Sequence, residues 1–128
     1  MIKQNLSSVR GKIYGICAKI GRDSSEITLA AITKGRNVEQ IREAIEAGIT
    51  DIGENKVQEA AVKCSRLQPD TSNLIPIRWH LVGHLQTNKA KEAIRIFDLI
   101  HSVDSLTLAF EINKQAANLG KIQDILIE

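Results

Sequence analysis

Residues 27–36 read ITLAAITKGR, and this stretch carries the first clear signal for the fold. Ile27 to Thr33 form an apolar run typical of a buried strand. Lys34 then stands where that strand should end, before Gly35 and Arg36. A lysine is costly to place against an apolar wall, so its position needs a reason. Either its side chain extends from the end of a sheet into water, or its amine has a chemical role there.

Strand-like and helix-like segments alternate along the rest of the sequence. Strands are predicted to begin near residues 27, 50, 77, 99 and 122, and QPDTSNLIP at 68–76 reads as a loop. Apolar residues at three- and four-residue steps predict a first helix and then one helix in each gap between strands. The predicted helices cover residues 2–20, 37–47, 57–67, 88–97 and 105–120.

This alternation predicts a parallel sheet with right-handed crossovers. The even spacing favours a TIM-type (β/α)8 barrel. Only five strands are predicted, and the last, IQDILIE at 122–128, has no helix to cover it. Because an uncovered apolar strand edge is a liability, the chain reads as part of something longer. We therefore expect an α/β fold in which residues 1–128 form the N-terminal part of a barrel domain, with five strands and a first helix.

The composition argues against several classes of protein. A net charge of +2 is too small to indicate nucleic acid or a membrane surface as the partner. The apolar runs are too short to span a bilayer, and the N-terminus shows helical periodicity rather than a signal peptide. Cys17 and Cys64 fall in predicted helices at a spacing that makes no metal site, which indicates reduced thiols in a cytoplasmic protein.

Polar residues gather where the predicted strands end. In barrels of this type, the chemistry sits at the carboxyl ends of the strands. Lysine, amide, imidazole and hydroxyl groups would therefore converge on one end of the sheet. The residues concerned are Lys34, Glu54, Asn55, His80, Gly83, His84, Gln86, Asn88, His101, Ser102 and Asp104.

Lys34 has the most distinctive chemistry of this set. A lysine held in an apolar pocket loses part of its proton affinity, and a neutral amine can attack an aldehyde to form a Schiff base. Pyridoxal phosphate is the common cofactor that uses such a lysine. On spacing alone, extension of the side chain into water is the commoner case.

Four segments resemble the signature segments of the pyridoxal phosphate homeostasis family, in the right order and spacing. The family shares its barrel with the N-terminal domain of alanine racemases. Its members bind pyridoxal phosphate, show little or no racemase activity, and are thought to buffer or carry the cofactor. The segments are LAAITKG at 29–35, DIGENKVQEA at 51–60, WHLVGHLQTNKAK at 79–91 and IHSVDS at 100–105.

The resemblance also implies roles for single residues. The family's Schiff-base lysine falls on Lys34, its GEN segment near the cofactor on Asn55, and its HSVDS strand end on Ser102. Its strand-and-loop segment WHxxGxLQxNK places His80 and Gly83 as further cofactor contacts, and no catalytic or metal-binding residue is implied. That segment falls on Trp79, His80, Gly83, Leu85, Gln86, Asn88 and Lys89.

The sequence departs from the family pattern in two places. Many members read Thr-Lys-Pro or a similar run, whereas here Gly35, Arg36 and Asn37 follow the lysine. This alters the loop that enters the second helix and leaves the amine in place. The family's phosphate-binding residues lie on the last strands, which are absent here. We therefore expect weak cofactor binding, and self-association through the open edges of the first and fifth strands.

Structural interpretations of the same residues stay open. Asn55 is equally suited to cap the helix beginning at Lys56. His80 can instead pack in a strand core, and Ser102 can instead partner a local turn. Three histidines suggest zinc, but no fourth ligand has a convincing spacing. His84 and His101 are interpreted as structural or exposed. Glu54 and Glu59 are interpreted as part of a charged helix face.

Two other functions compete with cofactor homeostasis. An amino-acid racemase needs an acid–base group on each face of the substrate carbanion, and Lys34 could serve one face. The only tyrosine, Tyr14, falls in the first helix, and the opposing tyrosine of racemases belongs to a second domain that is absent here. The other alternative is an inactive truncated fragment without the phosphate site.

Overall fold

The computed structural model describes residues 1–67 and 76–128, so most of the predicted loop at 68–76 lies outside the described residues. The described chain contains α1 (Ile2–Ile20), a 3-10 turn η1 (Ser24–Glu26), β1 (Ala30–Ile32), α2 (Val38–Glu46), β2 (Asp51–Glu54), α3 (Val57–Leu67), β3 (Arg78–Leu81), a 3-10 turn η3 (Thr87–Lys89), α4 (Ala90–Ile96), β4 (Leu99–Val103), α5 (Leu106–Asn118) and β5 (Asp124–Ile127).

The five strands form one parallel sheet in the order β1-β2-β3-β4-β5. One line of paired residues crosses it from Ile32 through Gly53, His80 and Leu99 to Asp124. The prediction of a parallel α/β fold with sequential strands and a first helix is therefore confirmed. A sequential parallel order with a helix in each crossover is the arrangement of the first five units of a TIM-type barrel.

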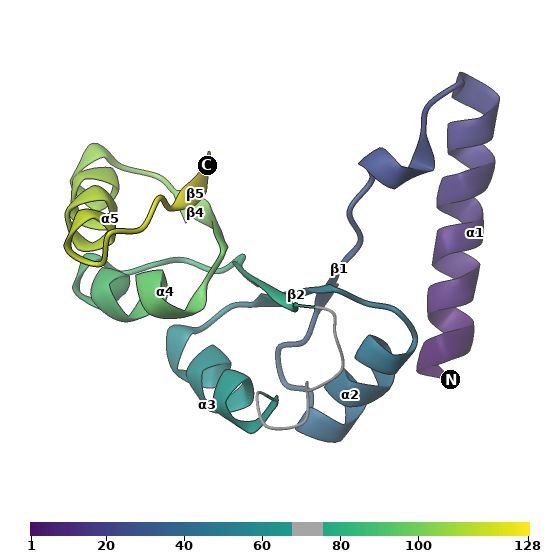
Figure 1. Ribbon diagram of the computed structural model, residues 1–128, viewed down its shortest axis with the longest axis horizontal. Coiled ribbons are helices and arrows are strands. Elements are labelled where there is room, and N and C mark those ends of the chain that lie inside the picture. Colours follow the sequence, from purple (N-terminus) through teal and green to yellow (C-terminus); the bar gives the residue numbers. More distant parts are fainter. Residues whose placement is uncertain (68–75) are drawn as a thin grey trace.

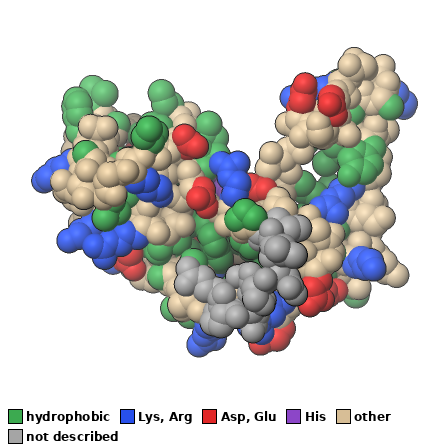
Figure 2. All heavy atoms as spheres, in the orientation of Figure 1, with side chains coloured by type: hydrophobic (Ala, Val, Ile, Leu, Met, Phe, Trp, Pro, Cys, Tyr) green, Lys and Arg blue, Asp and Glu red, His purple; other side chains and the backbone are tan. Residues whose placement is uncertain are grey.

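The helices follow one another along one side of the sheet. Figure 1 shows α2, α3, α4 and α5 in turn around the strands, with α1 standing beyond α2 at the opposite end from α5. The arrangement is an open arc. Figure 2 shows the same view with a notch between the two ends of the arc, where basic and acidic side chains gather at its floor.

Local capping explains where two of these helices begin. The Asn37 side chain accepts a hydrogen bond from Gln40 N at 2.8 Å, and the Gln40 side chain accepts one from Asn37 N at 3.2 Å. This capping box starts α2. The Ser105 hydroxyl accepts a hydrogen bond from Leu108 N at 3.1 Å and starts α5. Both capping residues are the first residues of helices predicted from the sequence, at 37–47 and 105–120.

Two elements differ from the sequence prediction. The strand predicted over 27–33 pairs only at Ala30–Ile32, because η1 precedes it and Asp23 holds that turn by accepting from Ser25 N at 2.9 Å. The helix predicted over 88–97 opens as η3 and becomes α-helical only at Ala90. Among the described residues, no side chain caps η3 or α4, which fits a first turn without regular α-helical geometry.

The core lies between the sheet and the helices that cover it. Ile52, Leu81 and Ile100 point into it from neighbouring strands and have no exposed surface. The other face of the sheet is less covered. A Cβ at Gly53 would lie 2.5 Å from Ile32 Cδ1, so the two residues share that face, where Ile32 is 47% exposed. Because neighbouring residues of a strand point to opposite faces, this is the side away from the core.

Cys17 is buried and Cys64 is half-buried, and both are thiols. Within residues 1–67 and 76–128, no helix combines the length and the apolar character needed to cross a bilayer.

Candidate functional site

Lys34 lies just past the carboxyl end of β1, in a tight turn. Thr33 O accepts a hydrogen bond from Arg36 N at 3.0 Å, and Gly35 has φ of +68°. These are the features of a four-residue turn with glycine at its third position. Lys34 is exposed rather than enclosed by apolar side chains, and no described residue hydrogen-bonds its ammonium group. The side chain is therefore accessible to a ligand.

Gly35 makes this turn different from a Thr-Lys-Pro turn. Proline holds φ near −65° and has no backbone N–H. Here residue 35 has a left-handed φ, and its N–H donates to Glu59 Oε1 at 2.9 Å. The departure from the family pattern therefore sits at a position where proline would fit neither the backbone nor the hydrogen bond.

Asn55 and Gly83 lie together at the ends of β2 and β3. A Cβ at Gly83 would come within 2.3 Å of Asn55 O and 2.8 Å of Asn55 Cα. Only a glycine allows the backbones to approach this closely. The role of Gly83 that the structure shows is to bring the Asn55 segment against the end of β3.

Replacing Gly83 with alanine is expected to destabilise the fold by about 1–3 kcal/mol, because backbone rather than a flexible side chain blocks the new methyl group. Thermal and urea unfolding measure this. Gly11→Ala is the matched control: Gly11 is in α1 with open space around it, and the change should stabilise by up to about 1 kcal/mol. Unfolding of Gly83→Ala at the wild-type midpoint would contradict the close approach.

His80 is the centre of a buried polar chain. Its Nε2 lies 2.8 Å from Asp51 Oδ1, and its Nδ1 lies 2.9 Å from His101 Nε2. Asp51 also accepts from the Thr50 hydroxyl at 2.6 Å. An ionised carboxylate only accepts, so Nε2 of His80 carries a hydrogen, and a neutral His80 then accepts from Nε2–H of His101 at its other nitrogen. The chain fixes both imidazole rings on neighbouring strands.

Burial, and then the neighbouring His80, lower the pKa of His101 below its usual value of 6.5. Because the folded-state pKa is depressed, the unfolded chain binds the proton first as the pH falls. The contribution of His101 to the free energy of unfolding is therefore complete above about pH 6.5. It is lost as the pH falls below that value.

We therefore expect the wild-type chain to lose more unfolding free energy between pH 7.5 and pH 5.5 than His101→Asn does. His84→Asn is the matched control, since the His84 side chain is 69% exposed and lies 3.6 Å from Asp104. Equal losses in the wild type and His101→Asn would contradict this account.

Ser102 follows His101 in β4 and is 2% exposed. Its hydroxyl is buried and has no hydrogen-bond partner among the described residues. Buried polar groups are rarely left unpaired, so Ser102 stands out among the described residues of β4.

The interpretation of Glu54 as part of a charged helix face is wrong, whereas Glu59 does lie on helix α3. Glu54 is not on a helix face: it ends β2 and has no exposed surface. Its carboxylate accepts from Lys63 Nζ at 2.5 Å and from the Thr33 hydroxyl. Lys63 also contacts Glu59 at 2.7 Å, and this pair lies four residues apart on α3. The Glu59–Lys63 spacing is the signal that could have identified this pair.

The predicted site residues thus fall into two groups. Lys34, Asn55 and Gly83 lie past the carboxyl ends of β1, β2 and β3, and the last two are in direct contact. His80 and Ser102 lie within β3 and β4. No three His, Cys, Asp or Glu side chains in the described ranges are grouped to hold a metal ion.

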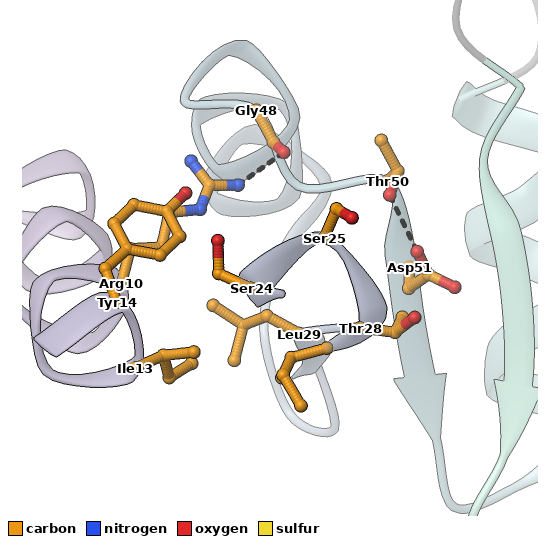
Figure 3. Close-up of a pocket in the computed structure, with 11 residues that line it drawn as sticks. Arg10, Ile13, Tyr14, Ser24, Ser25, Thr28, Leu29, Gly48, Thr50 and Asp51 are labelled. Atoms are coloured by element: carbon orange, nitrogen blue, oxygen red, sulfur yellow. Dashed lines mark hydrogen bonds between the residues drawn. The ribbon is translucent and has the colours of Figure 1, made fainter. Parts of the chain in front are cut away.

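A cavity of about 500 Å³ lies at the other end of the sheet (Figure 3). Thr28 and Leu29 before β1, and Thr50 and Asp51 at the start of β2, form one wall. Arg10 and Tyr14 of α1 face them, and Arg10 donates to Gly48 O at 2.5 Å. Tyr14, the only tyrosine, is therefore at the amino end of the strands, away from Lys34.

No family model matches the chain. Among curated proteins, it is 39% identical over 114 residues to the pyridoxal phosphate homeostasis protein of Escherichia coli (strain K12), covering 89% of the chain and 48% of that protein. It is 35% identical over 127 residues to the protein of the same name from Pasteurella multocida (strain Pm70), covering 99% and 53%. The chain thus spans about half the length of the curated relatives it matches.

Two solved structures superpose on nearly the whole chain. PipY of Synechococcus elongatus PCC7942, with PLP bound, superposes with a TM-score of 0.81 at 37% identity, covering 98% of the chain and 52% of PipY. An unknown protein from Bifidobacterium adolescentis superposes with a TM-score of 0.88 at 32% identity, covering 98% and 53%.

Proposed function

Since the chain is a relative of the pyridoxal phosphate homeostasis proteins and matches about half of their length, we propose that it holds pyridoxal phosphate as a Schiff base on Lys34. Its role is intracellular homeostasis of that cofactor rather than turnover. The cytoplasm is the compartment in which Cys17 and Cys64 stay reduced.

The observation that carries the proposal is the position of Lys34. Its exposed amine stands at the carboxyl end of β1, the end at which barrels of this type place their chemistry. PipY, whose structure contains PLP, superposes on 98% of the chain. Pyridoxal phosphate supplies an aldehyde, and attack by a neutral lysine amine forms a C=N bond with loss of water.

Other residues of the chain fit the same group. Asn55 and Gly83 lie just past the carboxyl ends of β2 and β3, the two strands that follow β1 in the sheet, and their backbones are in close contact. The Ser102 hydroxyl offers an unpaired hydrogen-bonding group, and His80 is held in one orientation by Asp51 and His101. We assign cofactor contacts to these residues and no proton-transfer step.

Residues 1–128 form, in this proposal, the N-terminal part of a cofactor-binding (β/α)8 barrel domain. β1 and β5 each pair with one strand in the described sheet, and the relatives are about twice as long. Amino-acid racemisation is not favoured, because Tyr14 lies at the other end of the strands from Lys34.

Self-association is expected at the β5 end of the arc. Ile122 and Ile127 are 93% and 88% exposed, and Leu106 and Phe110 of α5 are 76% and 69% exposed. An apolar strand edge of this kind pairs readily with another chain. Sedimentation velocity should show dimers or larger species that increase with concentration and decrease in Ile127→Lys. A monomer at all concentrations would contradict the expectation.

Titration with pyridoxal phosphate, followed by visible absorbance, tests the proposed function. We expect a saturable Schiff-base band with one equivalent per chain. Pyridoxine 5'-phosphate, which has no aldehyde, is the control and should give no band. A band that grows without saturation would mean scattered reaction at surface lysines, and no band at all would favour an inactive fragment.

A further inference from the structure

The two neighbours of Lys34 in the chain are tied to the same group of charged side chains. Lys63 Nζ donates to Thr33 O at 2.6 Å, and Glu59 Oε1 accepts from Gly35 N at 2.9 Å. Lys63 also donates to Glu54 Oε1 at 2.5 Å and to Glu59 Oε1 at 2.7 Å. We call Glu54, Glu59 and Lys63 the Lys63 clamp. The clamp therefore holds the turn on both sides of Lys34.

The clamp connects the turn to two rigid elements. Glu54 is the last residue of β2, and Glu59 and Lys63 lie one turn apart on α3. The Thr33 hydroxyl also donates to Glu54. The turn that carries Lys34 is thus fixed to the neighbouring strand and to the helix that follows it.

Burying the charged pair of Glu54 and Lys63 costs free energy, so a gain in stability alone does not explain the pair. The side chains of Glu54 and Lys63 are 0% and 7% exposed. Taking two charges out of water costs several kcal/mol per ion, and well-packed apolar residues often replace such pairs without loss. A buried ion pair of this kind is better explained by a need for one defined local geometry.

Glu59 is the more exposed carboxylate of the clamp, and it joins Lys63 to the backbone of Gly35. The hydrogen bond from Lys63, and then the one from Gly35 N–H, lower the pKa of Glu59 below its usual value. The carboxylate is therefore ionised at neutral pH and accepts both bonds. A proline at residue 35 could not take part, because it has no N–H.

We propose that Glu54, Glu59 and Lys63 are positioning residues that hold the turn at Thr33–Gly35 so that the Lys34 amine is presented at the carboxyl end of the sheet. This inference rests on the proposed function of Lys34 as the Schiff-base residue. The Gly35–Glu59 bond adapts the clamp to the glycine that follows the lysine in this chain.

The test uses Glu59→Gln in the 128-residue chain, with Glu46→Gln on the exposed surface of α2 as the matched control. Hydrogen exchange at the Gly35 amide is measured first, without cofactor. Loss of a charged acceptor should speed this exchange by about tenfold in Glu59→Gln and leave it unchanged in Glu46→Gln. A wild-type exchange rate in Glu59→Gln would overturn the clamp, whatever the cofactor does.

The second readout is site-selective modification. The chain is treated with pyridoxal phosphate and borohydride, and peptide mass spectrometry gives the ratio of labelling at Lys34 to labelling at the exposed Lys56. We expect this ratio to fall several-fold in Glu59→Gln, since a purely structural role would not change selectivity between two exposed lysines. An unchanged ratio would overturn the positioning role. Absence of Lys34 labelling in the wild type would instead refute the proposed function.

Discussion

Lys34→Ala is expected to abolish the saturable visible band that pyridoxal phosphate produces, while the fold remains intact. Lys34 is exposed and lacks a hydrogen-bond partner among the described residues, so its removal should change the unfolding free energy by less than about 0.5 kcal/mol. The loss of the band would therefore report the chemistry of one amine and not a damaged structure.

The matched control is Lys56→Ala. Lys56 is also exposed and lies just past the end of the neighbouring strand β2, next to Asn55. We expect this variant to keep the wild-type band and the wild-type unfolding midpoint. A full band in Lys34→Ala, or its loss in Lys56→Ala, would show that another lysine holds the cofactor.

Lys63→Met is expected to have the largest effect on stability, a loss of about 3–5 kcal/mol in unfolding free energy. Lys63 is 6% exposed, and its removal leaves the fully buried Glu54 carboxylate without a counter-charge. Thr33 O also loses a donor. Urea unfolding at pH 7 measures the effect, provided that the variant folds at low temperature.

A double variant keeps this prediction testable. Lys63→Met combined with Glu54→Leu removes both charges, so the penalty of a lone buried carboxylate disappears. We expect the double variant to be more stable than Lys63→Met alone, while Lys56→Met stays within about 0.5 kcal/mol of the wild type. A Lys63→Met chain as stable as the wild type would show that the ion pair is not the buried contact described here.

The order of elements could be predicted because each depends on a local pattern. The apolar spacing gave the helices, and the short apolar runs gave the strands, since both report which face of an element is buried. The predicted helices begin at Asn37 and Ser105, the residues that cap them, because capping depends on a few consecutive residues. A parallel sheet then follows from strands that are always separated by a helix.

The contacts between elements could not be read in the same way. Asp51 begins β2, and its contact with His80 joins residues 29 positions apart. Glu54 was placed on a charged helix face, because nothing in the sequence shows that Lys63 returns from α3 to meet it. The sequence indicated that Lys34 is unusual but not how its turn is held, since the two bonds to its neighbours come from residues 24 and 30 positions away.

Borohydride reduction followed by peptide mapping tests the central claim most directly. The chain is mixed with excess pyridoxal phosphate, reduced, weighed intact and digested. We predict a single added pyridoxyl phosphate group per chain, located on the peptide that contains Lys34. Adducts spread over several lysines, or a single adduct at another lysine, would contradict the account.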